Sequence, residues 1–421
     1  MIQAKILALL VLLGLVFRLT VSRTIYSGDL NNHIGWSRSI MMEGGRGAYD
    51  REYTGIMQPT YPPLALNAFA TSYWAYSGIY SVSRWANNKW PVFPSKFIWW
   101  LEDQNTLPAF EKVIGIVSDL GIGVLIYLLA RTLGVSKNKS LLSAGIYIFN
   151  PAVWYNSTLW GQIESFPLFW LLLSVWLLYR SKWQWAHLAF MAALLSKQST
   201  IIFIPFFALF SLKTIGWKKT FLGGLLQLLF FYVAYLPFFN TGDILWPFKV
   251  YINRIQTGSG SNYVTDHAFN IWALYTKLQK IADSQIVWKN LTTQMVGMSG
   301  FVIGILLLIP KLVKKIQLKN LLSSMGLTSL LAFLLLTRMH ERYLASALPF
   351  LAVLTATSPI YAGMYALVSF GNLINMYHNW WVPTISSWVV WTSLWSTISV
   401  VAISLTVVSV VWMLKYCYDK K

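Results

Sequence analysis

The sequence predicts an all-α protein that crosses a membrane several times. Hydrophobic residues make up 56% of its 421 residues, and the mean hydropathy is +0.53. Charged residues account for only 11%, whereas an average soluble domain carries about 25%. A soluble chain of this composition would have too little polar surface to cover its apolar interior, so the composition indicates a polytopic membrane protein.

About twelve apolar runs are candidate spans, since a helix that crosses the bilayer core needs roughly 20 apolar residues. The first run follows Lys5, lacks a small-residue cleavage site and leads into Arg23, so we expect a retained anchor rather than a signal peptide. We expect a bundle of about twelve transmembrane helices forming one domain over 1–421, with no separate soluble domain. The runs lie at 6–21, 113–130, 141–155, 165–179, 185–195, 200–212, 220–239, 291–310, 320–336, 343–357, 361–376 and 386–414.

The charges predict an orientation for these spans. When the loops are assigned to alternate sides, one side and both termini receive a single acidic residue, Asp419. By the positive-inside rule this side is cytoplasmic. Most acidic residues fall in two long segments on the other side, about 23–110 and 240–288, so we expect structured outer loops and a functional site there. The cytoplasmic basic residues are Lys5, Arg131, Lys137, Lys139, Arg180, Lys182, Lys213, Lys218, Lys219, Lys311, Lys314, Lys315, Lys319, Lys415, Lys420 and Lys421.

Several classes of protein are excluded. The net charge of +19 comes from 33 basic and 14 acidic residues, but the basic residues form no aromatic-interleaved patch in a soluble segment, which argues against nucleic acid as a partner. The single cysteine, Cys417, excludes a disulfide framework and a CxxC zinc site. No histidine pair has HExxH spacing.

Asp29 is the first candidate for chemistry, in the stretch YSGDLNNHIGW just after the first span. A carboxylate at the membrane boundary is expected to be partly desolvated, which favours proton acceptance near neutrality. An N-cap for a helix that starts at Leu30 is an equally good interpretation.

Two motifs border predicted helices on the outer side. The stretch from Tyr61 to Leu64, YPPL, predicts the start of a helix at the membrane interface, because its prolines lack N–H donors. After Asn150-Pro151 ends a span, the stretch LWGQIES opens the next one. It contains Trp160, Gln162 and Glu164. A carboxylate beside an apolar run suggests a functional site, and a water-exposed interfacial carboxylate is the alternative.

Two further groups carry positive charge on the outer side. Lys197-Gln198 interrupts an apolar stretch, and an outward ammonium there suits a phosphate or, equally, a lipid headgroup. The stretch RMHERY over 338–343 contains His340, Glu341 and Arg342 and suggests a compact anion site, with a structural ion-pair cluster as the alternative.

Two other groups are expected to be structural. Asp119, inside an apolar run, is expected to pair with Arg18 or another helix group. Residues 266–272 are expected to form a short helix that caps the outer cavity.

Several short motifs follow one another along the chain: GD, YPPL, NP followed by GQ-x-E, KQ-x5-P and HER. This ordered set resembles the GT-C superfamily of glycosyltransferases. It is most similar to bacterial relatives of the GPI-anchor mannosyltransferases and to the endoplasmic-reticulum glucosyltransferases that extend lipid-linked glycans. This resemblance implies an inverting hexosyltransferase, with mannose as the favoured sugar. It implies a polyprenyl-phosphate sugar as donor and a lipid-linked or other glycan hydroxyl as acceptor, at the non-cytoplasmic face of a bacterial plasma membrane rather than the endoplasmic reticulum.

The resemblance also implies roles for individual residues. Asp29 would be the general base, and Lys197, His340 and Arg342 would contact the donor phosphate. The expected substrate-binding residues are Tyr61, Trp160, Gln162, Glu164, Gln198 and Glu341.

No cofactor is expected, although Mg²⁺ or Mn²⁺ belongs to one alternative. That alternative is a metal-dependent oligosaccharyltransferase, for which Asp29, Glu164 and Glu341 would supply carboxylates. A transporter or flippase of lipid-linked sugars is the alternative from another class.

Overall fold

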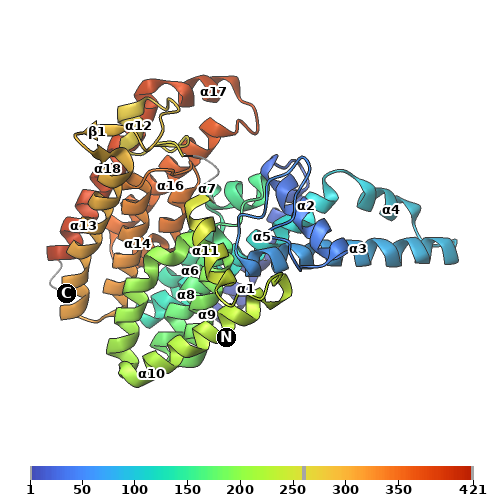
Figure 1. The fold of residues 1–421 in the computed structure, drawn as a ribbon, viewed down its shortest axis with the longest axis horizontal. Coiled ribbons are helices and arrows are strands. Elements are labelled where there is room, and N and C mark those ends of the chain that lie inside the picture. The colour runs from blue at the N-terminus through green and yellow to red at the C-terminus, as the bar shows by residue number, and fades with distance from the viewer. Residues whose placement is uncertain (1, 258–261, 419–421) are drawn as a thin grey trace.

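A computed structural model describes residues 2–257 and 262–418 and has an all-α architecture with one small two-stranded sheet (Figure 1). The charge-based orientation also used Asp419, Lys420 and Lys421, which lie outside the described residues. Residues 258–261 of the predicted outer segment lie outside them too. The α-helices are α1 (Ile2–Ser22), α2 (Asp29–Glu43), α3 (Pro63–Lys89), α4 (Ser95–Glu102), α5 (Thr106–Thr132), α6 (Lys137–Ile148), α7 (Pro151–Trp154), α8 (Ser165–Tyr179), α9 (Trp183–Ser196), α10 (Ile204–Tyr235), α11 (Trp246–Thr257), α12 (Ile271–Thr276), α13 (Thr293–Lys314), α14 (Leu318–Leu335), α15 (Leu348–Thr355), α16 (Pro359–Asn379), α17 (Ser386–Ser393) and α18 (Trp395–Tyr418).

Shorter elements complete the chain. A π-helical turn, η1 (Tyr155–Trp160), follows α7, and 3-10 turns occur at η2 (Gln198–Phe203), η3 (Leu236–Phe238) and η4 (Tyr343–Ala347). The antiparallel strands are β1 (Ile286–Trp288) and β2 (Leu291–Thr292).

Six helices in the described parts of the chain are long and apolar enough to cross a membrane. They are α1, α5, α13, α14, α18 and the continuous helical stretch Gln198–Phe238, which contains α10. This confirms a multi-pass membrane protein. The other predicted spans also form helices, but these are shorter or less apolar, so the number of about twelve spans stays a prediction.

One predicted span boundary is confirmed and another is wrong. The runs 200–212 and 220–239 form two helical segments, which lie within the bounds of α10 and meet at a kink at the non-helical residue Gly216. Gly216 has a φ of 80°, a left-handed conformation that glycine adopts without strain. In contrast, the run 386–414 is divided by an extended residue at Leu394 into α17 and α18.

The predicted outer loop at 23–110 is largely helical. The YPPL motif starts a helix as predicted, with Pro62 at the N-cap and Pro63 as the first residue of α3. This helix runs for 27 residues and projects away from the bundle, with α4 beside it (Figure 1). Alternating aromatic and polar residues give α3 no apolar run, which is why the sequence did not indicate a helix of this length.

Buried charges join the helices that carry the site. Arg18 in α1 lies 3.7 Å from Asp119 in α5, and both side chains are buried. This confirms the expected structural partner of Asp119, which also accepts a hydrogen bond of 2.5 Å from Ser157. In the second turn of α5, the Lys112 ammonium donates to the backbone carbonyls of Ser22 and Ile25, at 2.7 and 2.5 Å. These bonds fix the end of α1 and the turn that leads to α2.

Candidate functional site

Two adjacent cavities lie where the ends of several helices meet. The larger has a volume of about 980 Å³ and the smaller about 360 Å³. Asp29, Asp266, His340 and Arg342 line both. These four side chains therefore stand at the boundary between the two spaces, although they come from three distant parts of the sequence.

Asp29 is the first residue of α2, and Gly28 occupies the N-cap position. The interpretation of Asp29 as a cap for a helix starting at Leu30 is therefore wrong. The expected desolvation is also not observed, because the Asp29 side chain is exposed to the cavities. The Gln162 amide donates a 2.6 Å hydrogen bond to Asp29 Oδ2, which orients the carboxylate. A carboxylate fixed in this way and open to a cavity can accept a proton from a bound hydroxyl.

The turn before Asp29 is held against the turn after η1. Ser27 Oγ and its backbone N–H both donate to the Trp160 carbonyl, at 2.9 and 3.4 Å. The next residue, Gly161, has a φ of 89° and ends η1. A glycine is required here, because the chain turns in a left-handed conformation next to Leu30 and Lys112. The position of Asp29 thus depends on the close fit of two turns.

We expect replacement of Gly161 by alanine to lower the thermal unfolding temperature. The left-handed backbone costs about 1–2 kcal/mol for a residue with a Cβ, and this Cβ would lie 3.0 Å from a Leu30 methyl and 3.3 Å from Lys112 Cε. Gly134→Ala is the matched control, since Gly134 has a φ of 79° but open space around its Cβ position. The melting temperature in detergent should fall further for Gly161→Ala, and equal decreases would show that the turns do not fit closely.

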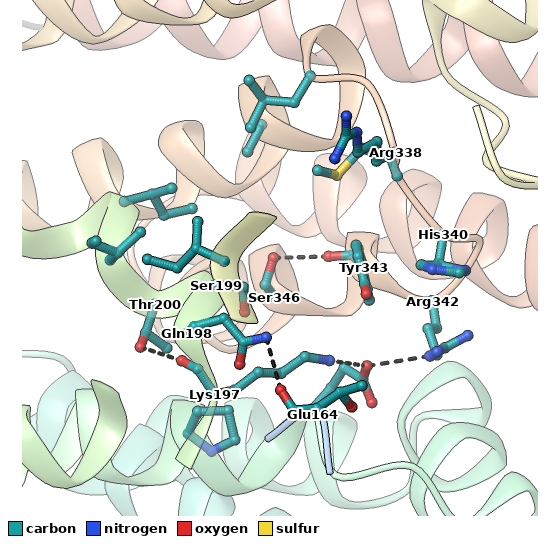
Figure 2. A pocket seen from close by; sticks show the side chains of 18 of the residues that line it. Glu164, Lys197, Gln198, Ser199, Thr200, Arg338, His340, Arg342, Tyr343 and Ser346 are labelled. Carbon is teal, nitrogen blue, oxygen red and sulfur yellow. Dashed lines mark hydrogen bonds and ion pairs between the residues drawn. The ribbon is translucent and has the colours of Figure 1, made fainter. Parts of the chain in front are cut away.

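A buried ionic cluster forms the charged end of the larger cavity (Figure 2). Lys197 Nζ lies 2.6 Å from Glu164 Oε1, and Arg342 Nε lies 3.4 Å from the same oxygen on its other side. The alternatives of a water-exposed Glu164 and of a Lys197 that reaches a lipid headgroup are therefore both wrong. Burial alone would raise the pKa of Glu164, but Lys197 and Arg342 overcome this effect and hold that pKa below its usual value. Glu164 is therefore an anion at neutral pH.

The HER stretch divides into a positioning residue and two lining residues. Glu341 is fully buried and lines neither cavity, so it is not placed for the direct contact with substrate that was predicted. Instead its Oε1 lies 2.7 Å from Arg342 Nη1 and holds the guanidinium in place. His340 and Arg342 line both cavities, and His340 Nδ1 lies 3.6 Å from Asp266 Oδ2.

The remaining predicted residues also reach the cavities. Tyr61 and Gln198 line the larger one, where Lys197 Nζ lies 5.7 Å from the Tyr61 ring centre. Gln198 donates to the carbonyls of Thr60 and Arg254, at 3.1 and 3.0 Å, and so ties the loop before α3 and the helix α11 to the site. Trp160 lines the smaller cavity instead. The predicted residues therefore gather in one region but divide between two spaces.

His33 is a lining residue that the sequence analysis missed. It follows Asp29 by four positions in α2, so a helical reading of this segment would have put both on one face. Its ring stacks on Phe69 with the centres 4.2 Å apart. Burial lowers the pKa of His33 to about 4, which leaves the imidazole neutral at physiological pH.

Asp266 was expected only within a helix that caps the cavity. Residues 266 and 267 instead pair with His340 through backbone bridges, and the short helix α12 begins later, at Ile271. No short-range sequence signal indicated this pairing, because the two segments are far apart in the chain.

The far end of the larger cavity is apolar. Its lining residues there come from α8, η2, α13 and α14, and they contribute hydrocarbon surface with few polar atoms. They include Leu168, Ile201, Ile202, Phe203, Met298, Phe301, Ala332, Phe333 and Leu336. One continuous cavity thus joins a charged end to an apolar end.

The carboxylates near the site do not converge on a metal position. Within residues 2–257 and 262–418, no group of three or more His, Cys, Asp or Glu side chains is arranged to hold a metal ion. Glu164 and Glu341, the expected ligands in the metal-dependent alternative, are each ion-paired with a basic side chain.

Fold and site together define a multi-pass membrane protein whose larger cavity is lined by both ionic and apolar side chains. No protein-family model matches the chain, and no curated protein matches its sequence. The chemistry of the site and the order of the motifs therefore carry the assignment of function.

Proposed function

We propose that the protein is an integral membrane glycosyltransferase of the GT-C type. It would move a hexose from a polyprenyl-phosphate donor to an acceptor hydroxyl at the non-cytoplasmic face of a bacterial plasma membrane. Mannose is the favoured sugar because of the nearest motif resemblance. The observation that carries the proposal is the larger cavity, in which a charged end and an apolar end form one space.

The cavity matches the two halves of a polyprenyl-phosphate sugar. An isoprenoid chain needs a hydrocarbon surface, which Phe301, Phe333 and their neighbours supply. The phosphate needs hydrogen-bond donors, which Lys197 and Arg342 supply in a site sheltered from water. A donor delivered through the lipid also suits an outward-facing enzyme, because nucleotide sugars are cytosolic.

The ionic cluster keeps donors for the phosphate. Lys197 has three N–H bonds, and its hydrogen bond to Glu164 uses one of them. Arg342 presents Nη1 to Glu341 and Nε to Glu164, so Nη2 remains for a ligand. Paired carboxylates thereby hold both cations ready, and the negative charge that develops on the leaving phosphate is stabilised without rearrangement.

The proposed reaction is a single displacement. Asp29 takes the proton of the acceptor hydroxyl, the hydroxyl oxygen forms a bond to the anomeric carbon, and the bond from that carbon to the phosphate oxygen breaks. The configuration at the anomeric carbon inverts, and polyprenyl phosphate leaves as an anion against Lys197, His340 and Arg342. Glu164 lines the larger cavity beside these cations and would bind a sugar hydroxyl of the donor or position the acceptor.

A transfer assay with purified protein tests the proposal. Radiolabelled polyprenyl-phosphate mannose and glucose are offered with a lipid-extract acceptor pool, with and without EDTA. We expect label to enter the acceptor pool from at least one donor and to survive EDTA. Movement of labelled donor across liposomes without covalent transfer would overturn the proposal in favour of a transporter.

Filling the apolar end should impair binding of long-chain donors selectively. Ala332 is buried in α14 and lines this end. We expect Ala332→Phe to raise KM for a long-chain polyprenyl-phosphate sugar by about tenfold, since a loss of 1.4 kcal/mol has that effect. KM for a two-isoprene donor should remain unchanged.

Ala366→Phe is the control, because Ala366 is exposed on α16 and lines neither cavity. An equal change for both chain lengths in Ala332→Phe would show that the apolar end does not receive the isoprenoid.

A further inference from the structure

The smaller cavity has a different chemistry from the larger one. It is lined by the rings of Trp160 and Trp380 and by polar side chains that include Asp266, His267 and Asn379. Lys197 and the apolar residues of the larger cavity do not line it. A space of about 360 Å³ falls near the lower end of the roughly 300–1,000 Å³ found for small-molecule sites, so it suits a small polar ligand.

The two tryptophans form a fixed aromatic wall. Their ring centres lie 5.4 Å apart with the planes inclined by 33°. Tyr155 packs edge-on against both rings, and its hydroxyl donates to the Trp380 carbonyl. Trp380 is half-buried, so part of its surface remains open to a ligand. The faces of such rings are electron-rich and attract the C–H bonds that line one face of a sugar ring.

The polar side of the cavity is held by pairing of two distant segments. The Asp266 N–H donates to the Met339 carbonyl at 3.0 Å, and Asn375 donates to the His267 carbonyl at 2.6 Å. His267 has a φ of 61°, an uncommon conformation for a residue with a side chain. Residues held in such conformations concentrate at binding sites. Its imidazole is thereby presented to the cavity with part of its surface exposed.

The charges in this cavity favour a neutral ligand. Two carboxylates, Asp29 and Asp266, face one guanidinium, Arg342, and the imidazoles of His267 and His340. This mixture offers donors and acceptors for several hydroxyl groups but no excess of positive charge for a phosphate. The larger cavity, which holds Lys197 and the hydrocarbon surface, is the better place for the anionic donor.

We propose that the smaller cavity binds the acceptor of the reaction as an uncharged carbohydrate, with a sugar ring against Trp380 and its hydroxyls on Asp266, His267 and Asn379. This inference rests on the proposed transferase function and names the acceptor class. Asp29 lines both cavities, so an acceptor hydroxyl would reach it from one side while the donor's anomeric carbon approaches from the other. That arrangement suits an in-line displacement.

Binding of a simple glycoside tests the subsite without relying on catalysis. Saturation-transfer NMR would use methyl α-mannoside and methyl α-glucoside with the full chain in lipid nanodiscs, since sugar-based detergents would compete. We expect saturation of at least one glycoside, reduced about tenfold by Trp380→Ala and largely restored by Trp380→Phe. Trp381→Ala is the matched control, because Trp381 is exposed and lines neither cavity. No saturation, or equal saturation in Trp380→Ala and Trp381→Ala, would overturn the subsite.

Kinetics separate this inference from the proposed function. With an active enzyme, Trp380→Ala should raise KM for the acceptor about tenfold and leave KM for the donor unchanged. Transfer with an unaltered acceptor KM would refute the subsite and leave the glycosyltransferase in place. Ring-dependent glycoside binding in a protein that transfers no sugar would refute the transferase and leave a carbohydrate-binding cavity.

Discussion

Replacement of Asp29 by asparagine is expected to slow sugar transfer by about 10²–10⁴-fold, the usual contribution of a general base. The substitution keeps the shape of the side chain, and the Gln162 amide that donates to Oδ2 retains an oxygen acceptor. Binding of the donor should persist, because Lys197 and Arg342 remain in place. Single-turnover transfer and equilibrium binding of labelled polyprenyl-phosphate mannose would measure the two effects separately.

Asp50→Asn is the control for the Asp29 prediction. It makes the same change of charge at an exposed position between α2 and α3 that lines neither cavity. Its transfer rate should match that of the unmodified protein. Undiminished transfer by Asp29→Asn would contradict the role of Asp29, and the base would then have to be Asp266 or Glu164, which also line the larger cavity.

Breaking the ion pair between Lys197 and Glu164 should have the largest effect on stability. Removing one partner of a buried pair costs about 3–5 kcal/mol, because the remaining charge is left in a dry site. We expect Lys197→Gln and Glu164→Gln each to lower the unfolding temperature strongly. The double variant removes both charges and should recover most of the loss in stability while sugar transfer remains lost. Thermal unfolding in nanodiscs and the transfer assay would follow the two properties independently.

Lys249→Gln provides the matched control for this pair. Lys249 Nζ lies 2.6 Å from Asp243, the same distance as in the buried pair, but both side chains are exposed. Exposed pairs contribute about 0–1 kcal/mol, so the unfolding temperature should hardly change. If the double variant regained transfer together with stability, Lys197 would have only a structural role.

The sequence predicted the fold class and much of the site through local signals. Hydropathy indicated the membrane bundle, and the YPPL motif marked the start of α3. Asp29, Glu164, Lys197 and Arg342 were expected together because the predicted topology puts them on one side of the membrane. The structure places all four on the larger cavity. For Glu164 and Lys197, which lie beside or within apolar runs, the cost of burying an unpaired charge explains why the sequence was informative.

The features that escaped prediction depend on contacts between distant segments. Glu341 looked like a lining residue, yet its partner Arg342 occupies the cavity and Glu341 lies behind it. Trp380 gave no signal, since a tryptophan near a helix end is usual in membrane proteins. The pairing of 266–267 with His340 joins the HER stretch to a segment without a motif of its own. Sequence patterns report the neighbours along a helix or strand, whereas these contacts are set by tertiary packing.

The buried pair of Arg18 and Asp119 has a consequence for biogenesis. Arg18 belongs to α1, and its partner lies in α5, which is synthesised later, after α2, α3 and α4. An arginine at the centre of an inserting helix costs about 2.5–3.5 kcal/mol on translocon scales, and Arg18, about one turn from the end of α1, carries part of that cost. Its guanidinium makes no hydrogen bond to the described residues. Helix α1 therefore carries an uncompensated charge until the carboxylate of α5 arrives, and the docking of these two helices is the step that pairs it.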